Sequence, residues 1–253
     1  MTLTALILAG TRHGQNDPVA KTAGVPYKAL AEINGTPMIR RVITALKESG
    51  NIDKITVSTP DDLPLNKDIQ RISCAKSPAR SVLNFLDTID ENTPFLLTTA
   101  DHALLSPAII KSFLNKYDTN RFDIGAAMLP LDILTQKYPA MRRTRLKFKD
   151  GSYKACNLFI FRNKAAAQNI LQFWLNIEAQ RKNPWKMIRA LGPAPLLRYL
   201  TEQLSLQDAL SHLGRKTQTT PQAIMLDIPE AAIDIDNPAD LEFVRNLIKN
   251  EKI

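Results

Sequence analysis

The feature that most constrains this chain is a short apolar run near its N-terminus that ends in a glycine. Residues 5–9 (Ala-Leu-Ile-Leu-Ala) have the length and composition of a buried strand, and Gly10 follows directly. The loop after Gly10 carries the cations Arg12, Lys21 and Lys28 together with further glycines and prolines. Backbone N–H groups beside such cations form an anion-binding concavity. We therefore predict that this strand and loop form a cradle for a polyphosphate.

Strands and helices alternate along most of the chain. Thr36 is expected to cap a first helix that begins at Pro37 and ends near Gly50. Further strands are predicted at 52–59, 69–74, 94–99, 122–129, 156–161, 224–228 and 231–235, with helices around 82–89, 107–117 and after residue 238. A strand, a helix and a second strand in this order imply a parallel, right-handed crossover. The chain is therefore assigned to the α/β class.

Composition sets limits on the class of protein. With 253 residues, of which 44% are hydrophobic, the chain can form one large domain, here taken as residues 1–253. A net charge of +8 favours anionic ligands without choosing among nucleotides, nucleic acid and an acidic membrane. Two distant cysteines and three histidines argue against a structural zinc site. No segment has the roughly 20 apolar residues of a membrane span, and we expect a soluble, cytoplasmic protein.

Several short motifs extend the argument from the first strand. They are Leu8-Ala9-Gly10, Thr11-Arg12, Lys28-Ala29-Leu30 and Gly35-Thr36-Pro37-Met38-Ile39. Together they resemble the signature of nucleotidyltransferases with the glycosyltransferase-A type of fold, a group that includes the molybdenum-cofactor guanylyltransferase and the sugar-phosphate nucleotidylyltransferases. Thr11 stands where the family has a second glycine, and Tyr27 precedes the signature lysine in place of proline. The resemblance implies a Rossmann-like three-layer sandwich with a mostly parallel central sheet.

The same resemblance implies which residues contact a nucleotide. The implied nucleotide-binding residues are Leu8, Ala9, Gly10, Thr11, Arg12, Lys28, Ser77, Pro78, Ser81 and Thr99. Ser77, Pro78 and Ser81 are placed beside the base and ribose. An equally good interpretation is that Ser77 or Ser81 only caps the following helix, and the sequence leaves both open.

Acidic residues at two distant places are the candidate metal ligands. Asp101 follows a predicted central strand, where open α/β sheets bind ligands, and Ser106 before Pro107 is the better helix cap. A later segment resembles the closing motif of the family and reads Asp234-Ile235-Asp236-Asn237-Pro238-Ala239-Asp240-Leu241. On a strand, Asp234 and Asp236 would share one face. The resemblance implies Mg²⁺ held by Asp101 and Asp236, with Asp234 as a further candidate; alternatively, Asp236 or Asn237 only caps the last helix.

A row of cations precedes a predicted hairpin and suggests where an acceptor binds. The row consists of Arg142, Arg143, Arg145, Lys147 and Lys149. Arginine side chains bind phosphate in bidentate fashion, so Arg143 and Arg145 are candidate acceptor-binding residues. An equally good interpretation is an edge strand that charge keeps soluble. On the strand that returns after the turn at Asp150 and Gly151, the resemblance implies that Asn157 faces the acceptor.

Residues 163–220 are helical by pattern and form an insertion that the resemblance does not explain. Basic residues alternate there with Trp174, Trp185 and Leu197. One interpretation is a weak contact with an anionic membrane surface. The more common alternative is that the apolar side packs on the sheet.

Taken together, these features predict an Mg²⁺-dependent nucleotidyltransferase with Lys28, Arg12 and Asp101 as catalytic residues. It would move NMP from CTP or GTP to a small phosphorylated acceptor and release pyrophosphate. Nucleic acid is not expected as a partner, and the oligomeric state is left open. Two alternatives are a glycosyltransferase that uses a nucleotide-sugar and a non-catalytic module that binds a nucleotide or a membrane surface.

Overall fold

A mostly parallel sheet runs through the molecule. The computed structural model describes residues 3–10, 16–139, 141, 145–180 and 192–251. Within them the strand order is β10-β7-β9-β6-β1-β4-β5, and β8 pairs with β9. The strands are β1 (Leu3–Leu8), β4 (Ile52–Thr59), β5 (Gln70–Ser73), β6 (Phe95–Thr99), β7 (Ile124–Pro130), β8 (Leu146–Phe148), β9 (Gly151–Phe161) and β10 (Pro221–Met225). Strand β9 runs antiparallel to β6, β7 and β8, and the other pairs of this sheet are parallel.

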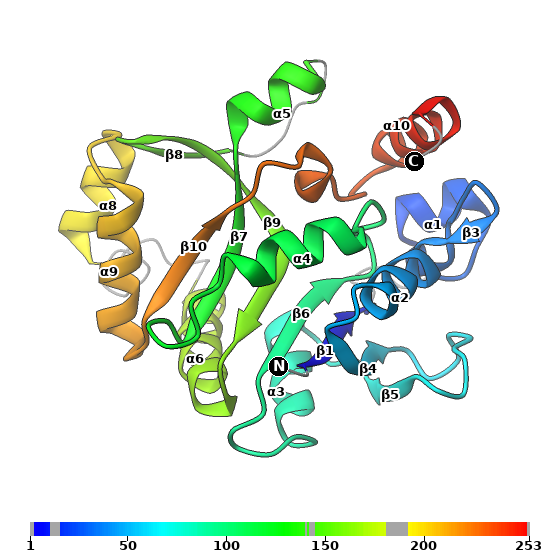
Figure 1. The fold of residues 1–253 in the computed structure, drawn as a ribbon, viewed down its shortest axis with the longest axis horizontal. Coiled ribbons are helices and arrows are strands. Elements are labelled where there is room, and N and C mark those ends of the chain that lie inside the picture. Colours follow the sequence, from blue (N-terminus) through cyan, green and yellow to red (C-terminus); the bar gives the residue numbers. More distant parts are fainter. Residues whose placement is uncertain (1–2, 11–15, 140, 142–144, 181–191, 252–253) are drawn as a thin grey trace.

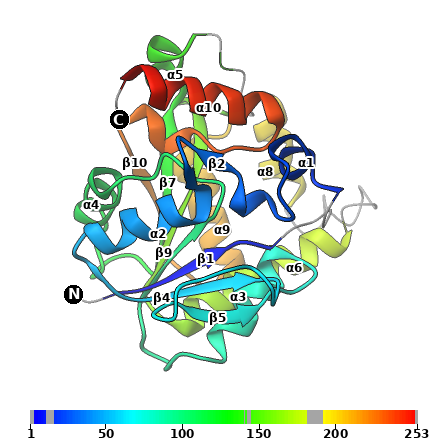
Figure 2. The same ribbon diagram turned by 90° about the vertical axis from the view of Figure 1, so that its right-hand side faces the viewer.

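Helices cover both faces of the sheet (Figures 1 and 2). One core contains buried side chains of α2 (Met38–Glu48), α4 (Pro107–Asn115) and α10 (Pro238–Glu251). A second core, on the other face, contains buried side chains of α3 (Pro78–Leu86) and α6 (Lys164–Gln180). The predicted α/β sandwich with a Rossmann-like, mostly parallel sheet is therefore confirmed.

Strand β1 lies between the two cores, and its sequence explains why. Ala5 and Ile7 belong to the first core and Leu6 to the second, and all three are fully buried. A parallel strand covered on both faces needs apolar residues at consecutive positions, which is what this run supplies. The end of β1 is thereby fixed at the middle of the sheet edge, between β4 and β6.

The segment between β1 and α2 folds into short elements. These are α1 (Pro18–Ala23), the 3₁₀ turn η2 (Lys28–Leu30), β2 (Glu32–Ile33) and β3 (Thr36–Pro37). The Asp17 carboxylate caps α1 by accepting hydrogen bonds from the N–H groups of Val19 and Ala20 at 2.9 and 3.1 Å. This part of the chain carries Lys28 back to the end of β1.

The expected cap at Thr36 is wrong. Thr36 pairs with Ile33 in the β2–β3 hairpin, and α2 begins at Met38 without a side-chain cap. The turn between the two strands is Asn34-Gly35, and both residues have positive φ (50° and 73°). Two such residues are typical of the tight turn that joins a hairpin, and the pairing uses Thr36 before a helix can begin.

The strand predicted at 231–235 is also wrong. Pro229 opens the 3₁₀ turn η3 (Pro229–Ala232), and residues 233–236 then run without regular secondary structure to α10. The apolar residues that suggested a strand are buried, since Ile233 and Ile235 are fully inaccessible. The strand-like pattern therefore reflects burial alone. The backbone N–H of Ile235 donates to the carbonyl of Asp101 and does not join the ladder of a sheet.

The region 163–220 is helical where the structure describes it. It contains α6, α8 (Pro193–Leu200) and α9 (Leu206–Thr217), and residues 181–191 of the predicted helical region lie outside the described residues. That this region is an insertion into a single domain of residues 1–253 stays a prediction. The short helix α5 (Leu131–Lys137), which the sequence did not predict, follows β7. Across the described residues, no helix combines the length and the apolar character that crossing a membrane requires.

Candidate active site

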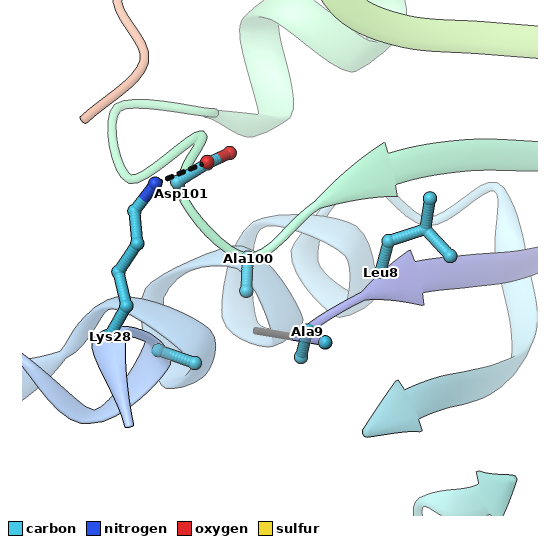
Figure 3. Close-up of a pocket in the computed structure, with 7 residues that line it drawn as sticks. Leu8, Ala9, Lys28, Ala100 and Asp101 are labelled. Carbon is cyan, nitrogen blue, oxygen red and sulfur yellow. Dashed lines mark hydrogen bonds and ion pairs between the residues drawn. The ribbon is translucent and has the colours of Figure 1, made fainter. Parts of the chain in front are cut away.

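Three segments that are distant in sequence meet beside the end of β1. Lys28 comes from η2, Asp101 lies two residues after β6, and Asp236 lies between η3 and α10. The Lys28 Nζ is 2.7 Å from Asp101 Oδ2 and 3.9 Å from Asp236 Oδ1. The backbone N–H of Ile235 donates to the carbonyl of Asp101 (3.1 Å), which ties the two acidic segments together. Both carboxylates thus approach the same lysine, and Figure 3 shows its bond to Asp101.

A pocket opens at this meeting point (Figure 3). It is lined by the end of β1, the η2 turn and the segment after β6, namely Leu8, Ala9, Gly10, Lys28, Ala29, Ala100 and Asp101. The predicted cradle needs unused backbone N–H groups, and Ala9 does not supply one, since its N–H donates to the Ser58 carbonyl at 2.8 Å. The Leu8 carbonyl likewise accepts from Ala100 N–H at 2.9 Å. Leu8 and Ala9 therefore form the wall of the pocket.

Gly10 has a packing reason to be glycine. A Cβ at this position would lie 3.2 Å from the Cβ of Cys74, closer than most real contacts of this kind. Cys74 directly follows β5, so any side chain at residue 10 would push against the β5–α3 connection. The glycine thus keeps the end of β1 narrow next to the pocket.

The electrostatics of Asp101 favour its charged form. Burial opposes ionisation of Asp101. The charge of Lys28 and its hydrogen bond to the carboxylate, together with a hydrogen bond from Thr99 Oγ1, nevertheless hold the pKa of Asp101 below the ordinary value. Thr99, a predicted nucleotide-binding residue, is thus placed against Asp101 at the end of β6. A partly buried carboxylate that stays ionised can bind a cation or orient a lysine.

Asp236 and Asp234 differ sharply in exposure. The Asp236 side chain is 63% exposed. Partial burial of its carboxylate and the negative charges of Asp234 and Asp101 raise the pKa of Asp236, and the positive charge of Lys28 opposes this shift. Asp234 is buried, and its Oδ2 lies 3.4 Å from both Lys154 Nζ and Asn157 Nδ2. Negative charge therefore accumulates around Asp101 and Asp236, while Asp234 has polar partners on β9.

Residues other than Asp101 and Asp236 cap the two helices that follow them. Ser106 Oγ accepts from Ile109 N–H and caps α4, which leaves Asp101 without a capping role. At α10 the cap is Asn237, whose Oδ1 accepts from Asp240 N–H at 3.0 Å. Asp240 in turn accepts from the N–H of Asp236, so the Asp236 side chain is left to face Lys28.

The residues predicted beside the base have structural roles at the start of α3. Ser77 Oγ accepts from Arg80 N–H and caps the helix, whose first residue is Pro78. Ser81 is buried, and its Oγ accepts from Ala75 N–H at 2.9 Å. The capping interpretation holds for Ser77, whereas Ser81 braces the loop before the helix. Nucleotide contact by these residues stays a prediction.

Of the predicted acceptor residues that the structure describes, Asn157 lies next to the acidic residues and Arg145 does not contact them. Asn157 lies on β9, next to the acidic residues through its contact with Asp234. Arg145 lies exposed just before β8, and in the described part of the chain no contact joins it to the acidic residues. Arg143 lies outside the described residues, as do Thr11 and Arg12. Their roles stay predictions.

Two residues, buried His102 and partly buried Arg41, contact the segment that carries Asp101. His102 is 1% exposed, and burial lowers its pKa although Asp101, Asp234 and the backbone of Asn157 and Ala231 oppose the shift. The Arg41 side chain donates to the Ala103 carbonyl at 3.2 Å. His102 is therefore a packing neighbour of Asp101.

Sequence reasoning missed Lys154, which contacts Asp234. Counting by twos along β9, Lys154 is in phase with Cys156, Leu158 and Ile160, all of them buried. A lysine in phase with core residues needs an anionic partner. The alternation of residues along β9 was therefore the sequence signal that could have identified Lys154 as a candidate site residue.

The acidic residues fit a magnesium ion better than a transition metal. Among the described residues no group of three or more His, Cys, Asp or Glu side chains is arranged to hold a metal ion. Mg²⁺ typically takes only one or two protein carboxylates and completes its shell with phosphate and water. Asp101 and Asp236 supply that number of oxygen ligands beside the pocket.

Comparison with known protein families identifies the family of this chain. Residues 5–142 match the model of a family described as the MobA-like NTP transferase domain. No curated protein sequence matches the chain.

Solved structures share the fold over nearly the whole chain. A hypothetical transferase from Thermus thermophilus has a TM-score of 0.81 at 22% identity, covering 95% of this chain and 100% of the other. CMP:2-keto-3-deoxy-manno-octonic acid synthetase complexed with CTP has a TM-score of 0.60 at 14% identity, covering 99% of each chain. The 2-C-methyl-D-erythritol 4-phosphate cytidylyltransferase, also from Thermus thermophilus, has a TM-score of 0.56 at 13% identity, covering 98% of this chain and 100% of the other.

Proposed function

The chain belongs to the MobA-like NTP transferase domain family and is a nucleotidyltransferase, and from this premise we propose its reaction. It transfers NMP from CTP or GTP to a small phosphorylated acceptor and releases pyrophosphate, with Mg²⁺ as cofactor. The observation that carries the proposal is the meeting of Lys28 with Asp101 and Asp236 beside the pocket at the end of β1.

The reaction needs positioning and charge stabilisation, with no nucleophile from the protein. A phosphate oxygen of the acceptor attacks the α-phosphorus in line, and a new P–O bond forms. The bond from the α-phosphorus to the oxygen bridging to the β-phosphate breaks, and that oxygen leaves with the electron pair as part of pyrophosphate. Negative charge grows on the α- and β-phosphates during this step, so fixed cations at the pocket lower its barrier.

Each residue has a distinct task in this proposal. Lys28 places its ammonium group beside the triphosphate, and Arg12 adds a second cation from the loop after Gly10. Asp101 and Asp236 would hold the Mg²⁺, which supplies charge neutralisation to the phosphates when bound. Asp101 also orients Lys28 through their 2.7 Å ion pair. Gly10, Leu8 and Ala9 shape the wall against which the phosphates lie.

Two observations bear on the choice of nucleotide. Two of the structural neighbours use cytidine nucleotides by name, which favours CTP, whereas the resemblance to guanylyltransferases favours GTP. The β5–α3 connection with Ser77, Pro78 and Ser81 is the segment we assign to the base and ribose.

An assay of pyrophosphate release tests the proposal directly. Protein and Mg²⁺ are incubated with each NTP and a mixture of phosphorylated sugars and polyols. We expect release with CTP or GTP that depends on both Mg²⁺ and acceptor, and that is lost in Lys28→Met. Transfer from a nucleotide-sugar without pyrophosphate release would instead identify a glycosyltransferase. Absence of both activities, with nucleotide still bound, would indicate a non-catalytic binding module.

A further inference from the structure

A second lysine lies on the opposite side of the acidic residues from Lys28. Lys154 on β9 places its Nζ 3.4 Å from Asp234 Oδ2, and the two side chains are only 13% and 11% exposed. A lysine is rarely buried to this extent without a partner, since desolvation of the charge is costly. The position of this cation therefore needs a reason.

The backbone of β9 is distorted at this place. Pairing with β7 passes from Ala126–Phe159 to Met128–Ala155, so a step of two residues on β7 matches a step of four on β9. On a regular strand, Lys154 and Asn157 would point to opposite faces because they are three residues apart. Both nevertheless reach the same oxygen of Asp234. Irregularities of this kind commonly re-aim side chains next to active sites.

The need to neutralise Asp234 does not by itself explain why a lysine lies at position 154. The pair is separated by 3.4 Å, against 2.7 Å for Lys28 and Asp101. An ammonium group has three donors, and among the described residues Asp234 is the one hydrogen-bond acceptor that Lys154 reaches. Two donors are thus available for another acceptor, in a place where unused donors are costly.

The order of strands in the sheet indicates which ligand could accept hydrogen bonds from the two remaining N–H groups of Lys154. The pocket with Lys28 lies at the end of β1, and Asp101 follows β6. Strand β9 pairs with β6 on the side away from β1, and because it runs antiparallel, its early residues lie at the sheet edge where β1 and β6 end. Lys154 is therefore across Asp101 from the nucleotide pocket.

We propose that Lys154, anchored by Asp234 and set by the irregular part of β9, binds the phosphate group of the acceptor. The inference rests on the proposed function and adds a residue to it. The acceptor is a phosphate monoester whose oxygens accept from Lys154 and Asn157, with the nucleotide on the other side of Asp101. Asp234 acts as a positioning residue for Lys154, which separates its role from that of Asp101 and Asp236.

The test uses methyl phosphate as the acceptor probe. Binding is measured calorimetrically with Mg²⁺ and saturating α,β-methylene CTP or GTP, whichever binds, so that no transfer occurs. Lys154→Met should weaken methyl phosphate binding by about tenfold or more, as expected for loss of a charged hydrogen bond, and Lys154→Arg should restore most of it. Nucleotide affinity should not change. Lys164→Met is the matched control and should leave both affinities unchanged, because this lysine is similarly buried (16% exposed), pairs with Glu91 and lies beyond the other end of β9.

The outcomes separate this inference from the function on which it rests. If the nucleotide binds but methyl phosphate does not, or binds equally to Lys154→Met, the role of Lys154 is overturned and the nucleotidyltransferase proposal stands. If wild-type protein binds no nucleotide, both fall. Should Lys154→Met fail to fold, Lys154→Met/Asp234→Asn removes both members of the pair and must show the same loss of methyl phosphate binding.

Discussion

Lys28 keeps two carboxylates close to each other that would repel without it. It contacts Asp101 at 2.7 Å and Asp236 at 3.9 Å, and only 19% of its side chain is exposed. Among the described residues, no other lysine lines the pocket at the end of β1. A single side chain thus connects the acidic residues to the place where the phosphates are proposed to lie.

The first prediction concerns this lysine. Lys28→Met removes the positive charge at similar side-chain length, and we expect turnover to fall on the order of 10²-fold or more, as for loss of one preorganised charge-stabilising group. Steady-state pyrophosphate release is the measurement. Lys47→Met, which removes an exposed lysine paired with Asp68, is the control and should retain activity. Equal activity of the two variants would contradict the role of Lys28.

The second prediction concerns Asp236, which is exposed and adjacent to other carboxylates. Asp236→Asn should leave the free energy of unfolding within about 0.5 kcal/mol of wild type in the absence of metal, as for most surface changes. It should also raise the Mg²⁺ concentration needed for half-maximal activity by about tenfold or more, because one of two proposed ligands loses its charge. Denaturant unfolding and an Mg²⁺ titration measure the two effects.

Asp227→Asn provides the matched control for this prediction. Asp227 is also exposed and lies near a lysine, Lys116, away from the pocket. This variant should change neither the stability nor the Mg²⁺ requirement. An unchanged Mg²⁺ requirement in Asp236→Asn would remove Asp236 from the proposed metal site.

At the residue scale, sequence reasoning found the residues that short motifs specify. Lys28 and Asp101 follow glycine and strand signals, so their meeting could be predicted from the order of elements. Alternation along β9 could have marked Lys154 as a lysine among core residues, but its contact with Asp234 could not be predicted, because it depends on a register irregularity between β7 and β9. Arg145 was assigned by charge alone, and charge does not say on which side of an edge strand a residue lies.

At the scale of elements, the cap of α10 controls where Asp236 points. Asn237 accepts from Asp240 N–H, and Asp240 accepts from the N–H groups of Asp236 and Asn237. This reciprocal arrangement resembles a capping box and fixes the backbone directly after Asp236.

The third prediction follows from that cap. Asn237→Ala should lower the free energy of unfolding by about 1 kcal/mol, whereas Asn237→Asp should retain the cap and the stability. Because the backbone beside Asp236 loses a restraint, we also expect a raised Mg²⁺ requirement in the alanine variant alone. Urea unfolding and an Mg²⁺ titration of both variants are the measurements. Equal stability of the two variants would show that Asn237 does not cap the helix.

The turn η3 is attached to α5 through Glu230. Its Oε1 accepts from Lys137 Nζ at 2.6 Å and from the Tyr138 hydroxyl. Burial would raise the pKa of Glu230, but the hydrogen bonds of Lys137 and Tyr138 outweigh it and lower the pKa below the ordinary 4.5. The folded state therefore favours the ionised form.

The fourth prediction is the pH dependence that this shift implies. A lowered pKa contributes stability that is present above the unfolded value and is lost as the pH falls through the folded value. Wild type should exceed Glu230→Gln by on the order of 1 kcal/mol near pH 7, and the difference should shrink below about pH 4.5. Urea unfolding of both proteins across pH 3 to 7 measures it, and a difference that grows on acidification would reverse the assigned sign.

Sequence patterns located most elements because apolar runs and helix caps are local. The strand at 52–59 and the cap at Ser106 were predicted as the structure has them, and capping by Ser77 was one of two interpretations left open. The errors lie where tertiary contacts decide. Residues 231–235 are buried like a strand, yet Ile235 bonds to the Asp101 backbone, and Thr36 pairs in a hairpin instead of capping a helix.

At the scale of the whole molecule, the sheet order separates two proposed ligands. The nucleotide pocket lies at the end of β1, while Lys154 and Asn157 lie on β9, beyond β6. Only the central strand β6, which is followed by Asp101, lies between them. Two substrates that react with each other must approach from different sides of the reacting phosphorus, and this order of strands provides the two sides.

The fifth prediction uses the stability of the whole protein to identify the nucleotide. A ligand that binds the folded state at about 100 times its Kd adds about 2.7 kcal/mol to the free energy of unfolding. For a chain of 253 residues this corresponds to a rise in Tm of roughly 5–10 °C. We expect this rise with Mg²⁺ and either CTP or GTP, but not both equally, and a smaller rise for Lys28→Met. Since the net charge of +8 attracts any polyanion, tripolyphosphate with Mg²⁺ is the control. A rise with tripolyphosphate as large as with the nucleotide would mean that the phosphates alone are recognised, and no rise with either nucleotide would contradict nucleotide binding at this site.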